Sequence, residues 1–447
     1  MRAGHVLAVQ AALADHVARL AWSREQLNRY RDQRLRAFLT YARERSPFHA
    51  VRLRDVDVST VSTAHLARIP AMTKAQAQDE WDSIVTVPDL TRDGVEHILE
   101  SQQWFSYTRG DDQVFSSGGS SGVRGVYVWG WDFFVSAACL AWRMQARSDG
   151  NESSSRSPAR MAVLEAGVPP HASTPLFDVP VCADMQTVVI PAGEPFDRVL
   201  AAVAAARPTH LVGYSSVVAR LARAALAGEL DCRPVRVSTN SEPLLEEDRR
   251  AIREAWQAPV HNLWGSTEIG VQAVGCGLGD GLHVCEDEVV LERVDENGSP
   301  VGPDEPAART LATGLANRTF PFIRYDLGDQ VTWLAGTCEC GSSFARVADI
   351  GGRRDDDFRY GRISVPAGAF RHVLGTDPRI SEYQVAQTIA GADIVVVGTP
   401  DVNALRTALT VALREFGLSA PVVHVGVVER IPRHHATGKL RRFIPRD

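Results

Sequence analysis

A chain of 447 residues is long enough for two or more domains with a large buried core. An apolar fraction of 45%, a charged fraction of 23% and a net charge of −6 are ordinary for a globular protein and argue against a nucleic-acid partner. No apolar run approaches the roughly 20 residues that span a bilayer, and seven cysteines without a secretion signal argue against a disulfide framework. We therefore expect a cytoplasmic protein with no membrane partner.

The predicted elements alternate between helices and strands from the N-terminus onward. Residues 6–46 carry apolar side chains at helical spacing, and a second helix is predicted over 133–146. The polar stretch 148–159 is expected to be a surface loop. Between 161 and 261 short apolar runs alternate with Ala-rich stretches, which favours α/β layers, and 262–350 is rich in strand signals.

A charge run at 353–357 predicts a domain boundary. Beyond it, a strand (394–398), a helix (402–416) and a strand (422–428) predict a small α/β unit. The expected fold is therefore α/β, with a large N-terminal domain of layered sheets and helices (1–354) and a small mobile C-terminal domain (355–447).

The stretch SSGGSSG at 116–122 lies between an apolar approach and a strand-like exit. Its glycines let the backbone turn sharply, and its N–H groups and hydroxyls can wrap a polyphosphate. Arg124 and Gly125 follow where a P-loop would have Lys and Ser or Thr, so a Walker-type NTPase is not indicated. Taken alone, a Ser/Gly stretch of this kind is more often a flexible loop.

Four later stretches carry groups suited to a nucleotide, although each also has a plainer structural interpretation. Residues 262–268 (NLWGSTE) offer a ring for a base, a hydroxyl for phosphate and a carboxylate for Mg²⁺, or a strand end entering a turn. Residues 324–329 (RYDLGD) suit ribose hydroxyls, or a capped turn with an ion pair. Gly352 and Arg353 begin what reads as a solvated linker, and Lys439 lies on what reads as an exposed turn.

In this order the stretches resemble the motifs of the adenylate-forming acyl ligases, the superfamily of acyl-CoA synthetases, luciferases and peptide-synthetase adenylation domains. More narrowly, the chain resembles the phenylacetate-CoA ligase and coenzyme F-390 synthetase branch over nearly its whole length. The segments that carry the narrower resemblance are SPF (46–48), SEPL (241–244), WGSTEIG (264–270), FPFIRYDLGD (320–329) and CECG (338–341).

The resemblance implies a role for each matching residue. ATP phosphates would lie on the loop Ser116, Ser117, Gly118, Gly119, Ser120, Ser121 and Gly122. Ser241, Glu242 and Pro243 would border the adenine, Trp264 would pack on it where the family usually has tyrosine, and Asp329 and Arg353 would hold the ribose. The catalytic set would be Lys439 on the carboxylate and α-phosphate, Thr267 on phosphate and Glu268 on Mg²⁺. Asp355 matches the hinge, and Gly361 matches the loop that enters for the second half-reaction.

The chain departs from the family pattern in three places. The loop lacks the family's lysine and proline, although Arg124 could supply charge. Trp264 replaces tyrosine, and the C-terminal domain is slightly short, which puts the thiol-acceptor surface in doubt. None of these changes removes a group that adenylation requires.

A zinc site is also predicted. Cys276 and His283, followed by Cys338 and Cys340, make three thiols and one imidazole, a normal tetrahedral set. Similar positions in the branch support the set, whereas Cys285 is a competing ligand and four reduced residues without a metal are the alternative. With four protein ligands, the zinc would be structural. The remaining cysteines, Cys139, Cys182 and Cys232, are expected to be small apolar core residues.

The implied function is ATP-dependent activation of a carboxylic acid, aromatic or arylacetic by resemblance, followed by transfer to coenzyme A. Transfer to a carrier-protein thiol or to an amine is one alternative, and a catalytically silent ATP-binding homologue is another. The implied cofactors are ATP, Mg²⁺, coenzyme A and structural Zn²⁺, and the branch suggests a homodimer. Tyr214, Trp129 and Trp131 are candidate walls of the acid pocket.

Overall fold

The computed structural model describes residues 1–102, 106–117, 124–151, 159–166, 171–180, 185–302, 305–434 and 438–446, with the backbone alone at 149–151. Its centre is a nine-stranded sheet in the order β13-β14-β9-β8-β7-β6-β5-β3-β4. Five neighbouring strands run parallel: β3 (Arg160–Glu165), β4 (Gln186–Pro191), β5 (His210–Tyr214), β6 (Arg236–Asn240) and β7 (Val260–Ser266). All but the edge strand β4 are buried at their centres. Antiparallel strands extend the sheet beyond β7: β8 (Gly270–Val274), β9 (Leu282–Val284), β14 (Arg346–Val347) and β13 (Trp333–Leu334).

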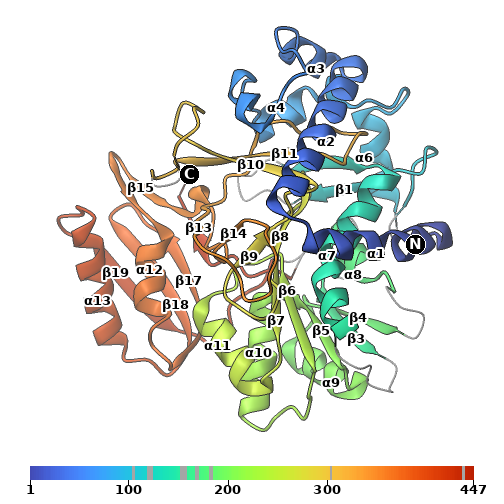
Figure 1. Ribbon diagram of the computed structural model, residues 1–447. Coiled ribbons are helices and arrows are strands. Elements are labelled where there is room, and N and C mark those ends of the chain that lie inside the picture. Colours follow the sequence, from blue (N-terminus) through green and yellow to red (C-terminus); the bar gives the residue numbers. More distant parts are fainter. Residues whose placement is uncertain are drawn as a thin grey trace.

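Helices between the parallel strands cover this part of the sheet (Figure 1). They are α8 (Ser173–Phe177), α9 (Phe196–Ala206), α10 (Ser215–Leu226) and α11 (Glu246–Trp256). Apolar residues at helical spacing on α10, among them Val217, Val218 and Leu221, are buried in one core cluster with the strands. This alternation of strands and helices places the carboxyl ends of β3, β5 and β6 at one edge, where α/β folds bind ligands.

The N-terminal third is mainly helical, and the 6–46 helical region is divided in two. The 3₁₀ turn Arg19–Ala21 ends α1 (Ala3–Ala18), and Ser23 starts α2 (Arg24–Arg45) with a capping box to Gln26. The other helices here are α3 (Pro47–Arg52), α4 (Lys74–Asp79), α5 (Trp81–Ile84), α6 (Arg92–Ser101) and α7 (Trp131–Asn151), with a 3₁₀ helix at Thr63–Arg68. The surface loop expected over 148–159 was placed too early, because α7 continues to Asn151; 152–158 lie outside the described residues.

Two small sheets lie near these helices. One pairs β1 (Gln113–Ser117) with β2 (Gly125–Trp129), and the other contains β10 (Val289–Val294), β11 (Arg309–Gly314) and β12 (Tyr325–Asp326). Buried residues from β1, β2 and α7, including Phe115, Tyr127 and Phe134, join one large core with the end of the main sheet.

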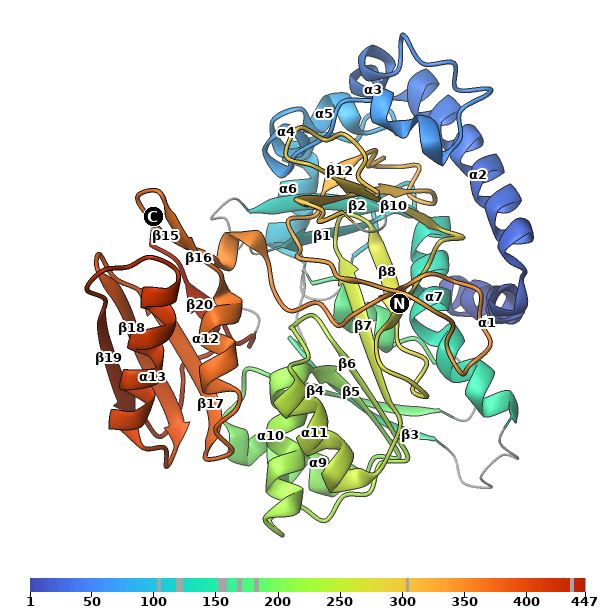
Figure 2. The ribbon, with the colours of Figure 1, turned by 60° about the vertical axis from the view of Figure 1, so that its left-hand side comes forward.

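The last 90 or so residues have a core of their own, and Figure 2 shows them beside α10 and α11. After the 3₁₀ turn Arg354–Asp356 come the hairpin β15 (Phe358–Tyr360) and β16 (Ile363–Val365), α12 (Ala367–Leu374) and α13 (Val402–Glu415). A four-stranded sheet has the order β19-β18-β17-β20, from β17 (Ile380–Gln387), β18 (Gly391–Gly398), β19 (Val422–Val427) and β20 (Phe443–Ile444). The α/β class is confirmed, whereas the boundary at 354/355 and the mobility of the smaller unit remain predictions.

Among the described helices, none combines the length and apolar character needed to cross a membrane.

Candidate functional site

The predicted nucleotide-binding segments converge on two adjoining cavities between the main sheet and the C-terminal residues. The larger, about 420 Å³, lies at the carboxyl ends of the parallel strands, and the smaller, about 290 Å³, shares Lys74, Glu268 and Arg353 with it. Predicted residues on the wall of the larger cavity are Ser117, Ser241, Thr267, Glu268, Arg353 and Lys439. Asp355 lies on the wall of the smaller cavity. Gly118, Gly119, Ser120, Ser121 and Gly122 lie outside the described residues, and Ser116 is buried at the end of β1.

The carboxylate of Glu268 is held by two tyrosines. The hydroxyl of Tyr127 donates to Glu268 Oε1 at 2.7 Å, and that of Tyr325 donates to the same oxygen at 3.0 Å. Burial and the neighbouring carboxylate raise the pKa of both phenols, so both remain proton donors. An oriented carboxylate beside the hydroxyl-bearing Thr267 fits a hard cation such as Mg²⁺, which prefers oxygen ligands.

Trp264, Asp329 and Arg353 form a chain behind the cavity wall. The indole nitrogen of Trp264 donates to Asp329 Oδ2 at 2.8 Å, and Nε of Arg353 donates to Oδ1 at 3.2 Å. Burial raises the pKa of Asp329, whereas Arg353 and Trp264 lower it. Trp264 and Asp329 are buried, with exposures of 6% and 8%, and neither lines the cavity. Arg353 does line it.

Glu242 links the main sheet to the C-terminal segment. Its Oε2 accepts the backbone N–H of Ser216 at 3.0 Å, and its Oε1 accepts that of Leu440 at 2.6 Å. Its neighbour Ser241 has a φ of 62°, the left-handed region, and lies on the cavity wall, whereas Pro243 does not. The carboxylate therefore positions the residue that follows Lys439.

Lys439 is half-buried, so the exposed turn expected there was wrong. The turn is closed by hydrogen bonds between His434 and the pair Gly438 and Lys439, and Gly438 (φ 70°) lies so close to Gly193 that a Cβ would meet its backbone at 2.6 Å. This approach directs the lysine inward, with its Nζ 5.3 Å from the centroid of the Tyr214 ring. Burial lowers the pKa of Lys439, and nearby carboxylates oppose that shift.

Lys74, and not Arg124, brings a positive charge to the cavities. Arg124 forms an ion pair with Glu96 at 2.5 Å and does not line either cavity. Lys74, the first residue of α4, lines both cavities, and Glu268 opposes the lowering of its pKa by burial. The sequence contains only two lysines, Lys74 and Lys439, and both lie on the larger cavity. The rarity of lysine was a signal available from the sequence. Where a chain uses arginine for nearly all its positive charges, a lysine indicates a position that requires a compact, titratable ammonium rather than a permanently charged guanidinium.

Two further residues of the site carried no signal in the sequence. His171 lines the cavity, and burial, Lys439 and His434 lower its pKa to about 4. Glu165, at the end of β3, is fully buried, and this raises its pKa to about 7.

Of the candidate pocket walls, Trp129 lines the cavity and Tyr214 faces Lys439. Trp131 instead stacks on His5 at 3.8 Å and is not part of this site.

The matched residues of the second half-reaction lie at the start of the smaller unit. Asp355 is in the 3₁₀ turn Arg354–Asp356. Gly361 has a φ of 63° at the β15–β16 turn, and a side chain there would meet no atom within 4 Å. The tip of this hairpin is therefore free of contacts around Gly361 in the described part of the chain.

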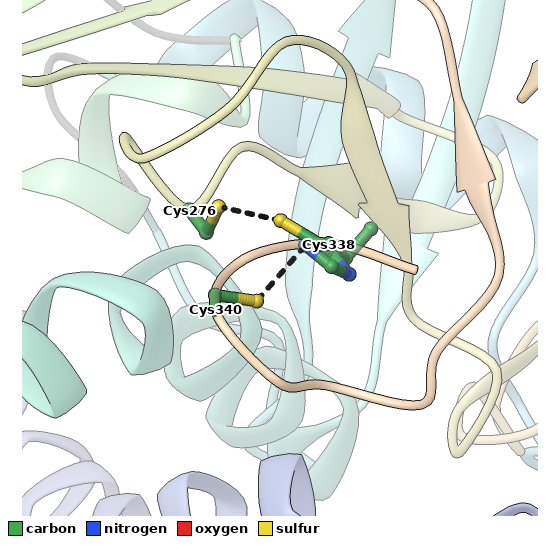
Figure 3. Close-up of side chains that lie close together, drawn as sticks. Cys276, Cys338 and Cys340 are labelled. Carbon is green, nitrogen blue, oxygen red and sulfur yellow. Dashed lines mark hydrogen bonds between the residues drawn. The ribbon is translucent and has the colours of Figure 1, made fainter. Parts of the chain in front are cut away.

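The four candidate zinc ligands come together at the β8–β9 end of the main sheet. Their ligand atoms all lie within 4.8 Å of one another, with Cys276 Sγ 3.6 Å from Cys338 Sγ and Cys340 Sγ 3.3 Å from His283 Nε2 (Figure 3). A tetrahedral zinc with bonds of about 2.3 Å to sulfur separates two sulfurs by about 3.8 Å, so this spacing fits the ion. Cys340 lowers the pKa of the Cys276 thiol while its own pKa rises, as when two thiols share a proton.

The other cysteines behave differently. Cys285 is buried outside the four-ligand set, and burial raises the pKa of its thiol to about 12. Cys139 and Cys232 are buried among apolar side chains, and Cys182 lies outside the described residues.

The order of sheets, the small C-terminal unit and the cavity between them define the class: this is the fold of the adenylate-forming ligases. A crystal structure of 2-hydroxyisobutyryl-CoA ligase in the postadenylation state matches with a TM-score of 0.71 and 18% identity, over 95% of this chain and 91% of that one. The anthranilate CoA ligase AuaEII matches with a TM-score of 0.51 and 18% identity, over 75% and 66%.

Sequence similarity points to a narrower group. The chain is 28% identical over 154 residues to a phenylacetate-coenzyme A ligase of Thermus thermophilus, and 29% identical over 127 residues to the protein CapK of Staphylococcus aureus. These matches span 34% and 26% of the two relatives and 32% and 28% of this chain. No family model matches the chain. The resemblance to the adenylate-forming ligases, and to their phenylacetate-CoA ligase branch, is confirmed.

Proposed function

We propose that the protein is an AMP-forming acid–thiol ligase that activates a carboxylic acid with ATP and passes the acyl group to coenzyme A. The observation that carries the proposal is the convergence of Lys74, Thr267, Glu268, Arg353 and Lys439 on one cavity of about 420 Å³. Three cations and a carboxylate suited to Mg²⁺ match the charge that builds when a carboxylate displaces pyrophosphate.

Lys439 would act at the reacting atoms. Its ammonium lies on the cavity wall and can contact both the incoming carboxylate and the α-phosphate. A fixed positive charge there gains strength as negative charge develops, which lowers the barrier to acyl-adenylate formation. Glu268 would hold Mg²⁺, which neutralises phosphate charge when bound.

The arrangement of the two units is suited to this first step. Arg442 of the C-terminal segment reaches Asp248 of α11 at 2.9 Å, and Arg433 reaches the Ser216 hydroxyl at 2.6 Å. The TM-score against 2-hydroxyisobutyryl-CoA ligase is 0.71 for its postadenylation state and 0.58 for its thioesterification state. Transfer to coenzyme A would require these contacts to break so that Gly361 and its hairpin enter the site.

The acid would be aromatic or arylacetic. Trp129, Leu176, Phe177, Leu263 and Val271 supply an apolar wall to the cavity, as binding of a ring requires. The phenylacetate-CoA ligase name of the Thermus relative supports the same class. Transfer to a carrier protein or an amine differs only in the second step, and a silent homologue would retain the cavity without turnover.

The test measures pyrophosphate release and hydroxamate trapping with Mg-ATP and a panel of aryl, arylacetic and aliphatic acids, with and without coenzyme A. Adenylation of one class, with a thioester only when coenzyme A is present, supports the proposal. Lys439→Ala should reduce adenylation about 100- to 1000-fold, whereas Arg430→Ala, an exposed residue of the same segment, should not. Undiminished adenylation in Lys439→Ala would overturn the mechanism, and adenylate without thioester would favour another acceptor.

A further inference from the structure

Three polar residues end three neighbouring parallel strands. Glu165 ends β3, Tyr214 ends β5 and Asn240 ends β6, and the strand register pairs Leu164 with Gly213 and Tyr214 with Asn240. The three therefore lie in a row at the carboxyl edge of the sheet, where Asn240 lines the larger cavity. All are buried, with exposures of 0%, 0% and 1%.

Glu165 is a buried carboxylate whose hydrogen bonds leave part of its charge unbalanced. The Ser173 hydroxyl donates to its Oε2 at 2.8 Å. Its buried Oε1 has no hydrogen bond of standard geometry in the described part of the chain, although Asn240 and Tyr214 both act on the same carboxylate. A carboxylate without water around it is costly unless a cation lies nearby. Burial raises the pKa of Glu165 to about 7, whereas Ser173, Asn240 and then Lys439 act in the opposite direction.

Lys439 is the cation that faces this row. Its Nζ is 5.3 Å from the ring centroid of Tyr214, the middle residue. Burial lowers the pKa of Lys439, and the largest opposing effect comes from Glu165, followed by Glu242. The other charged or titratable groups that face the pair are Arg353, His171, His434 and Tyr214.

We propose that Glu165 is a positioning residue, which holds the Lys439 ammonium at the carboxyl ends of β3, β5 and β6 and keeps it protonated. The proposal rests on the role given to Lys439 in the proposed function. Glu242 fixes the backbone after the lysine through Leu440, and Glu165 fixes the charge itself. Together the two carboxylates bring the C-terminal segment and its lysine into the adenylation arrangement before substrates bind.

Glu165→Gln keeps the size of the side chain and an acceptor for Ser173 but removes the negative charge. The pKa of Lys439 should then fall by about one unit, because a nearby opposite charge no longer favours the ammonium. The wild type and the variant should behave alike well below pH 7, where Glu165 is protonated, and diverge above pH 8. A role in packing alone would lower stability without this pH dependence.

The experiment measures the pKa of Lys439 directly, by trace acetylation with acetic anhydride across a pH series followed by mass spectrometry of the peptides. Lys74 is the only other lysine in the sequence and serves as an internal reference. The matched control is Glu247→Gln, a partly buried carboxylate on α11 that is not among the groups acting on the pKa of Lys439. A second variant, Ser173→Ala, leaves Glu165 in place but removes its hydrogen bond.

The proposal predicts a lower Lys439 pKa in Glu165→Gln, a smaller shift of the same sign in Ser173→Ala, and unchanged Lys74 titration in both. An unchanged Lys439 titration in Glu165→Gln, or an equal shift of both lysines, would overturn it. Should Glu165→Gln fail to fold, Ser173→Ala decides between the same two outcomes. The labelling experiment needs no turnover, so it can decide the role of Glu165 even in an inactive protein. A wild type that adenylates no acid would refute the proposed function, and the Lys439 pKa would still be measured. Where turnover is found, the alkaline limb of adenylation should move to lower pH by the same shift.

Discussion

The indole N–H of Trp264 donates to Asp329 Oδ2 at 2.8 Å, and this bond connects a departure from the family pattern to the residue expected to hold the ribose. A tyrosine at 264 has no indole N–H to donate in this way. With Arg353 on the other oxygen at 3.2 Å, Asp329 is held from both sides in a buried position. The tryptophan therefore orients a carboxylate, whereas its buried ring does not line the cavity.

Trp264→Phe should weaken ATP binding about tenfold, because a hydrogen bond to a buried charged group is worth about 1.5–3 kcal/mol. Burial already raises the pKa of Asp329 and the indole lowers it, so the variant should raise that pKa further. Loss of ATP affinity on acidification should accordingly begin at a higher pH in the variant. Calorimetric titration with ATP between pH 5 and 8 checks both effects, and an affinity that does not change with the substitution would contradict them.

Alanine variants of Lys74 and Arg124 test which of the two side chains supplies the positive charge for the ATP phosphates. Lys74→Ala should lower kcat/KM for ATP about 10- to 100-fold, because a charged contact to phosphate is lost. Arg124→Ala should leave kcat/KM nearly unchanged, because this guanidinium is paired with Glu96 and lies off both cavities. Steady-state kinetics with saturating acid distinguishes the two. The opposite ranking would place the missing loop charge on Arg124.

Much of the fold follows from local pattern. The alternation of apolar runs and Ala-rich stretches expected between 161 and 261 is present, with the helices α9 and α10 between the strands β4, β5 and β6. The split near residue 20 was missed, because it depends on the short 3₁₀ turn and the Ser23 cap rather than on a glycine or proline.

Site residues that belong to a short sequence motif could be predicted, whereas site residues that only tertiary contacts bring together could not. Thr267 and Glu268 stand in one short segment, so their type and spacing indicate their chemistry. Lys74 and Glu165 lie in unrelated segments; the fold brings Lys74 to the cavity wall and buries Glu165 close enough to Lys439 to act on its pKa. Lys439 was placed on an exposed turn because a Gly-Lys pair is usually solvated, whereas the close approach of Gly438 to Gly193 directs it inward.

Removal of one cysteine of the four-ligand cluster should abolish metal binding. We expect roughly one zinc per chain in the wild type, and none in Cys338→Ser, with a lower melting temperature because the metal no longer links β9 to the 338–340 segment. Cys232→Ser, a buried cysteine in another core cluster, should keep the metal. Mass spectrometry for metals and thermal melts with and without a chelator provide the test. A wild type that contains no zinc after expression with the metal would rule out the site.

Acid should destabilise the protein through His16. This ring is buried, and burial, Arg19 and Arg143 lower its pKa to about 3 from an ordinary value of 6.5. Between these values the unfolded chain binds a proton that the folded chain does not, so the free energy of unfolding falls by about 1.4 kcal/mol per pH unit as pH decreases from 6.5. Above 6.5 the histidine adds no slope.

His16→Gln removes this titration, so the stability difference between wild type and variant should shrink by about 1 kcal/mol between pH 6.5 and 5.5, and by nearly 1.4 kcal/mol for the next pH unit. His97→Gln on the exposed face of α6 is the matched control, because an exposed ring has nearly the same surroundings folded and unfolded. Urea unfolding at several pH values measures both differences. A constant difference between wild type and His16→Gln would mean that His16 takes up its proton without unfolding, through the carboxylates of Asp287 and Glu288 that lie within 4.8 Å of the ring nitrogen.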